Sequence, residues 1–182
     1  MRKILLIAAA IAGLTACTST PKDPHLVALE NAIVKQLGEG TKVTIETFQK
    51  VDSTTFGEEI ARRRTTLEIR RKQNLKLAGQ YEAAGKVKNE AAKRSDAAND
   101  LKRLEGLSAI EFRLAANDSL DVVEAYIYKF SGSARTYKGT VNFTDMFVSI
   151  TPQHEVVGMD YKKEGALKSA GRLIPGYSAL FE

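Results

Sequence analysis

Hydrophobic positions recur at helical spacing in the first half of the chain and at alternate positions in the second half. From His25 to Leu37 an apolar residue returns every three or four positions, which predicts an amphipathic helix. Gly38 and Gly40 end it, and residues 41–51 then alternate as a strand. The first two expected elements are therefore a helix and a strand.

The longest helical stretch begins at Thr55, which has capping-box spacing with Glu58. We expect a turn at Gly85 and thus a helical hairpin over about residues 56–105, stopped by Gly106. Its first helix has an apolar stripe formed by Ile60, Leu67, Ala78 and Tyr81. Its second helix has a stripe of mostly small residues formed by Val87, Ala91, Ala98 and Leu101. One continuous helix that tolerates Gly79 and Gly85 is the alternative.

The first arm of this hairpin is longer than a strand of the sheet. About 28 residues at 1.5 Å each give a helix of roughly 42 Å, whereas a ten-residue strand spans about 33 Å. We therefore expect part of the arm to project beyond the sheet on which it packs.

Three further strands are expected after the helical region, over residues 121–131, 139–151 and 155–161. The apolar phase of the second one switches near Thr144, which predicts a β-bulge. Residues 166–173 have a weak helical pattern. Leu107 to Leu114 is expected to be a short helical or irregular continuation of the hairpin.

These elements predict one α+β domain over residues 25–182, with an N-terminal helix and an antiparallel sheet of about four strands. The long helical hairpin is inserted after the first strand. This order resembles cystatin-like and NTF2-like folds, in which a curved sheet wraps a helix. The resemblance implies a ligand pocket, whose walls here would be Tyr126, Tyr128 and Phe130 on one strand face. The inserted hairpin departs from the pattern of these folds.

The N-terminus has the features of an export signal. Arg2 and Lys3 precede an apolar run, Ile4 to Leu14, that is too short to span a bilayer. The run closes in Leu14-Thr15-Ala16-Cys17, which resembles the lipobox of bacterial lipoproteins. The resemblance implies that residues 1–16 are a cleaved signal peptide and that Cys17 carries the lipid, including an acyl chain such as palmitate. An ordinary secretory signal or a buried N-terminal helix is the alternative.

Residues 17–24 are polar and contain two prolines, so they are predicted to be a short lipidated tether to the membrane. In lipoprotein sorting, an aspartate directly after the cysteine favours the inner membrane in some bacteria. Thr18 stands in that position here. The resemblance therefore implies a lipid-anchored protein of the outer membrane that faces the periplasm.

Catalytic chemistry has little support in the sequence. Cys17 is the only cysteine, and His25 and His154 lack metal-ligand spacing, so we expect no metal and no cofactor. Both histidines are expected to be exposed. There is no glycine-rich phosphate loop and no nucleophile-elbow motif. Three carboxylates near one strand start could line a pocket or could belong to a solvated turn and strand edge: Asp118, Asp121 and Glu124.

Positive charge gathers in the predicted hairpin. Residues 57–105 contain thirteen Lys and Arg against eight Asp and Glu, whereas the segments on either side are each slightly acidic. The candidate partner-binding cluster is Arg62, Arg63, Arg64, Arg70, Arg71 and Lys72. Its partner would be an acidic protein or anionic lipid. Alternatively, it is a solvated face with pairs such as Glu59–Arg63 and Glu68–Lys72.

Nucleic acid is not an expected partner, because stacking aromatic residues do not interleave with the basic residues. Two short segments, residues 52–54 and 118–120, resemble the Asp-Ser/Thr-hydrophobic motif of a bacterial O-glycosylation system. That resemblance implies glycans on Ser53 or Ser119. Taken together, the sequence predicts a non-catalytic envelope lipoprotein that binds or scaffolds through the hairpin. A small-ligand carrier or enzyme with an NTF2-like pocket is the alternative.

Overall fold

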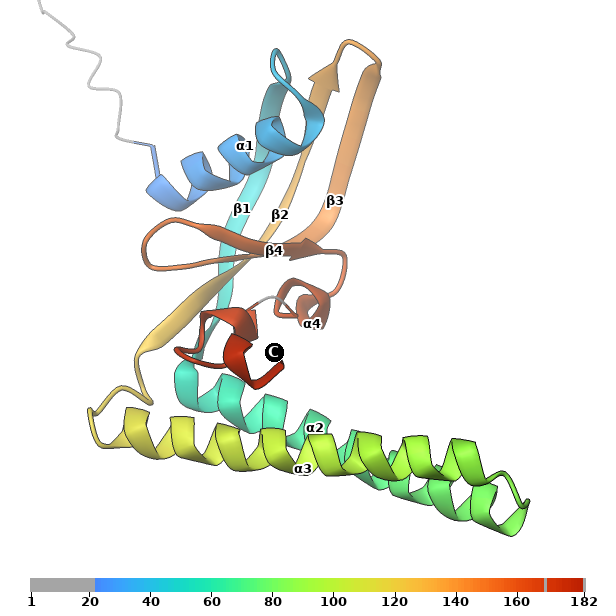
Figure 1. The fold of residues 1–182 in the computed structure, drawn as a ribbon. Coiled ribbons are helices and arrows are strands. Elements are labelled where there is room, and N and C mark those ends of the chain that lie inside the picture. The colour runs from blue at the N-terminus through green and yellow to red at the C-terminus, as the bar shows by residue number, and fades with distance from the viewer. Residues whose placement is uncertain (1–21, 169, 182) are drawn as a thin grey trace, which may run out of the picture.

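A computed structural model describes residues 22–168 and 170–181. Its four strands form one antiparallel sheet in the order β1-β2-β3-β4. The strands are β1 (Lys42–Thr55), β2 (Val123–Thr136), β3 (Gly139–Ile150) and β4 (Val156–Asp160). The helices are α1 (Pro24–Leu37), α2 (Phe56–Ala83), α3 (Val87–Ala115) and α4 (Lys163–Ala166), followed by 3-10 turns at Ala170–Leu173 and Ser178–Phe181. The predicted α+β class and element order are confirmed (Figure 1).

Helix α1 packs across one face of the sheet, and its C-terminal end lies towards the end of the sheet remote from the hairpin (Figure 1). It begins at Pro24, where Asp23 caps it by accepting a hydrogen bond from the His25 backbone N–H at 2.8 Å. Leu29 and Ile33 are fully or almost fully buried against β2 and β3. Their burial gives the sheet its main apolar core.

Helices α2 and α3 form the expected antiparallel hairpin. The capping box is present: the Glu58 backbone N–H donates to Thr55 Oγ1 at 3.2 Å, and the Thr55 N–H donates to Glu58 Oε2 at 3.0 Å. The chain reverses at Gly85, which has a φ of 67° that an L residue rarely adopts. The chain therefore forms a hairpin of two helices and not one continuous helix.

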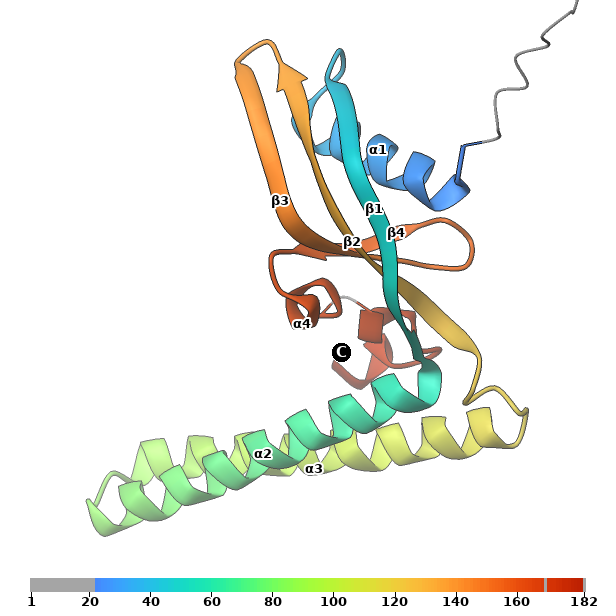
Figure 2. The same ribbon diagram turned by 180° about the vertical axis from the view of Figure 1, so that it is seen from behind.

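The hairpin lies at one end of the sheet and extends well beyond it, as the views from both sides show (Figures 1 and 2). The C-terminal segment covers only its root. There Ile174 and Tyr177 pack on Ile60, Leu107 and Ile110 to form a second apolar core. The remainder of the hairpin, beyond Leu67 and Leu104, is the arm, and its projection agrees with the helix length. The expected packing on the sheet was wrong, because the hairpin lies across one end of the sheet and its apolar root faces the C-terminal segment (Figures 1 and 2).

Two predictions for the second helix were wrong. The helix does not stop at Gly106 but continues to Ala115. Gly106 provides space for close packing instead, because a Cβ there would collide with Leu180. The expected stripe is also misplaced, since Val87 is 72% exposed and Leu101 41% exposed. The buried face is formed by Ala97, Asp100, Leu107, Ile110 and Leu114.

One bulge of the sheet was predicted, and another lies beside the root of the hairpin. The predicted bulge in β3 is present: Phe130 pairs with Met146 and Gly132 with Phe143, so β3 holds one extra residue. A second bulge lies where β1 passes into α2. There Thr54 pairs with Ala125 and Thr55 with Val123, which leaves Glu124 as the extra residue.

Candidate functional site

Two arginines of the predicted binding cluster are fixed at the root of the hairpin. Glu59, whose side chain is fully buried, forms ion pairs with Arg62 and with Arg63, the latter at 2.5 Å. Arg63 also donates to the Lys168 carbonyl at 2.7 Å, and Arg62 donates to Thr54 Oγ1 at 3.2 Å. These two guanidinium groups therefore join α2 to β1 and to the C-terminal segment.

Two more arginines join the two helices of the hairpin. Arg64 pairs with Glu111 of α3 at 2.5 Å and donates to Ser108 Oγ at 3.3 Å. Arg70 forms a two-pronged pair with Asp100 of α3. Four of the six cations therefore form ion pairs or hydrogen bonds that join elements of the fold, and do not form the expected solvated face. The predicted Glu59–Arg63 pair is present.

Arg71 and Lys72 differ from the other four. In the part of the chain that the structure describes, neither forms an ion pair, and the expected Glu68–Lys72 pair does not form. Lys72 is exposed, and Arg71 borders a groove of about 220 Å³ between the helices. The walls and floor of this groove include Leu75, Leu101, Ala97 and Ala98. These two cations are the members of the cluster that remain available to a partner.

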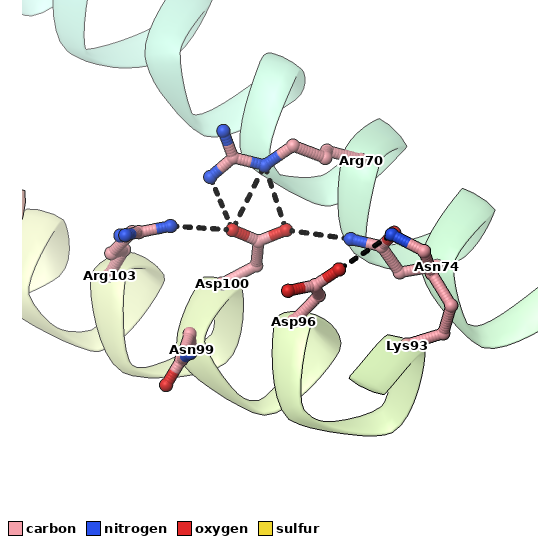
Figure 3. Close-up of a pocket in the computed structure, with 7 residues that line it drawn as sticks. All are labelled: Arg70, Asn74, Lys93, Asp96, Asn99, Asp100 and Arg103. Atoms are coloured by element: carbon pink, nitrogen blue, oxygen red, sulfur yellow. Dashed lines mark hydrogen bonds and ion pairs between the residues drawn. The ribbon is translucent and has the colours of Figure 1, made fainter. Parts of the chain in front are cut away.

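A polar cleft of about 310 Å³ lies along the other side of the hairpin seam (Figure 3). At its centre the Asp100 side chain, 2% exposed, accepts hydrogen bonds from Arg70, from Arg103 at 3.2 Å and from Asn74 at 3.5 Å. The hydrogen-bonded Arg70 guanidinium lowers the pKa of the Asp100 carboxyl. Beside it, Lys93 pairs with Asp96 at 2.6 Å. The charges in this cleft are largely neutralised by one another, so the network fixes the helix pair.

The strand face that was expected to line a ligand pocket belongs to the core. Phe130 is fully buried in the cluster that includes Leu29 and Ile33 of α1. Tyr128 is 6% exposed, and its ring stacks on Phe48 with centroids 4.3 Å apart. Tyr126 is partly buried beneath Lys50, whose Nζ lies 4.0 Å from the ring centroid. Packed side chains therefore occupy the face that the ligand-carrier alternative needs.

The two histidines meet in the structure. Their ring centroids are 4.6 Å apart, and the His25 ring also lies 5.4 Å from the rings of Tyr126 and Tyr128. The expected exposure of His25 was wrong, because its side chain is 16% exposed and its Nε2 is buried. His154 is exposed as expected. The sequence could not show this contact, since it depends on how α1 crosses the sheet.

The most unusual carboxyl group is Glu124, at the bulge between sheet and hairpin. Its side chain is buried, and neither carboxyl oxygen has a hydrogen-bond partner among the described residues. Burial, with a smaller contribution from the charge of Glu59, raises the pKa of Glu124 to about 8. Burial also raises the pKa of Glu59, against the opposing effect of its two arginines. Glu124 is therefore a buried acid and not part of a solvated strand edge, whereas Asp118 and Asp121 are exposed.

The two candidate glycosylation residues have different settings. Ser53 is partly buried in β1 opposite Tyr126. Ser119 lies in the turn after α3 and donates to the Asn117 carbonyl at 3.0 Å. The lipobox, Cys17 and most of the tether lie outside the described residues.

Comparison with known proteins gives no family for this chain: no family model, no curated protein and no solved structure matches it. Among residues 22–168 and 170–181, no helix is long and apolar enough to cross a bilayer. The same residues hold no group of three or more His, Cys, Asp or Glu arranged to bind a metal ion.

Proposed function

We propose that this protein is a non-catalytic lipoprotein of the bacterial cell envelope, anchored in the outer membrane and facing the periplasm, which binds a partner through its hairpin arm. The observation that carries the proposal is the hairpin itself. It extends beyond the sheet, and ion pairs between α2 and α3 brace it (Figure 1). A braced helical pair that projects from a small domain presents a fixed surface to a partner at little entropic cost.

The surface of the arm favours an acidic protein as its partner. Ile69, Leu75 and Leu101 are exposed by 53%, 42% and 41%, so apolar contact area is available there. Arg71, Lys72 and Lys76 lie beside them and form no ion pair within the described part of the chain. Apolar residues with nearby cations suit a partner that has an apolar patch with a carboxylate rim.

The anchor in this proposal is Cys17. Helix α1 begins at Pro24, so seven residues would join the lipid to the folded domain, a reach of about 23 Å. Several acyl chains hold a protein at a bilayer stably, whereas a single chain binds only marginally. The folded domain would therefore lie close to the membrane, and the arm would contact a partner protein near the membrane surface.

The test is in-cell crosslinking and pull-down with a charge-reversed arm. Arg71, Lys72 and Lys76 are changed to Glu, because the bridging arginines cannot be reversed without breaking the hairpin or its root. The matched control reverses three exposed lysines outside the hairpin: Lys35, Lys42 and Lys138. Expression and membrane fractionation must be equal for all three proteins.

A discrete partner captured by the wild type and by the control, but lost from the arm variant, supports the proposal. Equal capture by all three proteins, or capture lost only from the control, contradicts it.

A further inference from the structure

A second cleft lies where the root of the hairpin meets the C-terminal segment, away from the arm. Its volume is about 380 Å³, and its lining includes Arg63 of α2, Lys168 after α4, and Tyr177, Ser178 and Phe181 near the C-terminus. Both charged side chains among these lining residues are cations. The polar cleft on the hairpin seam differs, because there Asp96 and Asp100 offset the neighbouring cations.

Arg63 is held in place by two hydrogen bonds within the protein. Its Nε donates to the buried Glu59 carboxylate at 2.5 Å, and one terminal nitrogen donates to the Lys168 carbonyl at 2.7 Å. Its other terminal nitrogen has no hydrogen-bond partner in the described part of the chain. The guanidinium is thus oriented before any ligand arrives, which lowers the entropic cost of binding an anion.

The second cation is less constrained than Arg63. Lys168 is exposed, and none of the ion pairs within the described residues involves its ammonium group. Its backbone carbonyl accepts from Arg63, so the stem of the lysine begins next to the fixed guanidinium. Both cations therefore line the same cleft, and the backbone of one is bonded to the guanidinium of the other, so a small anionic group there could contact both.

The other lining residues are two aromatic residues and Ser178. The rings of Tyr177 and Phe181 meet edge to face with centroids 5.1 Å apart. Phe181 is 45% exposed, and Arg103 lies 4.7 Å from its ring centroid and steadies it. A half-exposed ring with a fixed neighbour offers a flat apolar surface to a ligand.

We propose that this cleft binds a small organic anion, with its carboxylate between Arg63 and Lys168 and its apolar or aromatic body on Phe181 and Tyr177. Such pairing of a few convergent polar groups with apolar walls is typical of small-molecule sites. A carboxylate can accept a charge-assisted hydrogen bond from the terminal nitrogen of Arg63 that has no partner, and one negative charge suits a site in which the buried Glu59 already offsets part of the positive charge. This site is independent of the hairpin arm.

The test is an NMR titration of the purified chain with phenylacetate and with 2-phenylethanol, which has the same ring but no carboxylate. Phenylacetate is expected to give saturable shifts at the cleft with a Kd on the order of 1 mM, a reasonable affinity for so small a ligand. 2-Phenylethanol is expected to bind at least about tenfold more weakly, because it lacks the charge. Lys168→Met should weaken phenylacetate binding to a similar degree, whereas Lys168→Arg should retain it.

Lys162→Met is the matched control, since Lys162 is an exposed lysine six residues before Lys168 in the chain and is not among the residues lining the cleft. Spectra of the free proteins show whether each variant is folded. Equal binding of the two probes, an unchanged Kd in Lys168→Met, or the absence of saturable shifts up to roughly ten times the expected Kd would each overturn the proposal.

Discussion

Among the carboxyl groups that the structure describes, Glu124 has the pKa that departs furthest from its ordinary value. Its burial at the bulge, next to Glu59, makes the neutral form favoured at physiological pH, with a pKa of about 8. In an unfolded chain the same group ionises near its ordinary pKa of 4.5. The raised pKa stabilises the folded protein fully below about pH 4.5, and this contribution is lost as the pH rises towards and beyond 8.

The Glu124→Gln variant tests this protonation. The amide imitates the neutral acid and cannot ionise, so relative to the wild type the variant is expected to be more stable by roughly 4 to 5 kcal/mol at pH 9 and nearly equal in stability at pH 4. Urea denaturation of both proteins across this range measures the difference. A difference that does not change with pH would show that Glu124 is ionised, or accessible to water, throughout.

Asp100 illustrates the opposite case, a buried carboxylate that is kept charged. Replacing it by Asn would leave Arg70 and Arg103 near the seam without their counter-ion, so we expect a loss of about 2 to 3 kcal/mol. Asp96→Asn is the control on the same helix. The Asp96 side chain is 49% exposed and pairs with Lys93, so this substitution should lower the free energy of unfolding by less than about 1 kcal/mol.

Thermal or urea unfolding of the two variants gives the comparison. Similar losses in both would mean that the Asp100 network contributes no more than an ordinary surface pair.

At the scale of the elements, α3 shows why its buried face was misjudged from the sequence. Apolar character alone predicts a stripe of Val87, Ala91, Ala98 and Leu101. The buried face of α3 instead includes Asp100, because Arg70 of α2 neutralises its charge. A charge that is buried through a partner thirty residues away cannot be recognised from hydrophobic periodicity. The stripe of α2 was better predicted, since Ile60, Leu67 and Ala78 are indeed buried.

The start of α2 was predicted well because its signal is local. Thr55→Val removes the capping hydroxyl while keeping the shape of the side chain, so we expect a loss of about 1 kcal/mol in the free energy of unfolding. Thr65→Val, at an exposed position inside the same helix, should change stability by less than about 0.5 kcal/mol. Equal effects of the two substitutions in urea unfolding would show that the cap contributes nothing particular.

At the scale of the whole molecule, the order of elements, the hairpin and its projection beyond the sheet could all be predicted. They depend on local periodicity, on the turn at Gly85 and on helix length. The meeting of His25 with His154, the burial of Glu124 and the cleft at Arg63 could not be predicted. Each requires two distant segments to be placed in three dimensions. The same reason explains why the arginine cluster was judged too accessible.

The proposed anchor makes a prediction for the intact protein. Cys17→Ser removes the only thiol that could carry a lipid, so the variant should lose incorporation of labelled palmitate and leave the membrane fraction. Wild-type protein that is equally unlabelled, or a variant that stays in the membrane, would contradict the proposed lipoprotein anchor.

In the proposed function the hairpin arm, and not the sheet, contacts the partner. The most direct measurement places a photo-crosslinking amino acid at one exposed position at a time in living cells. The arm positions are Ile69, Leu75 and Leu101. The positions on the β2–β3 hairpin of the sheet are Tyr137 in its turn and Thr140 and Val141 in β3. We expect one discrete crosslinked product, of the same mass, from the arm positions and not from the sheet positions. A product formed only from the sheet, or none from any arm position in a correctly fractionated protein, would contradict the account.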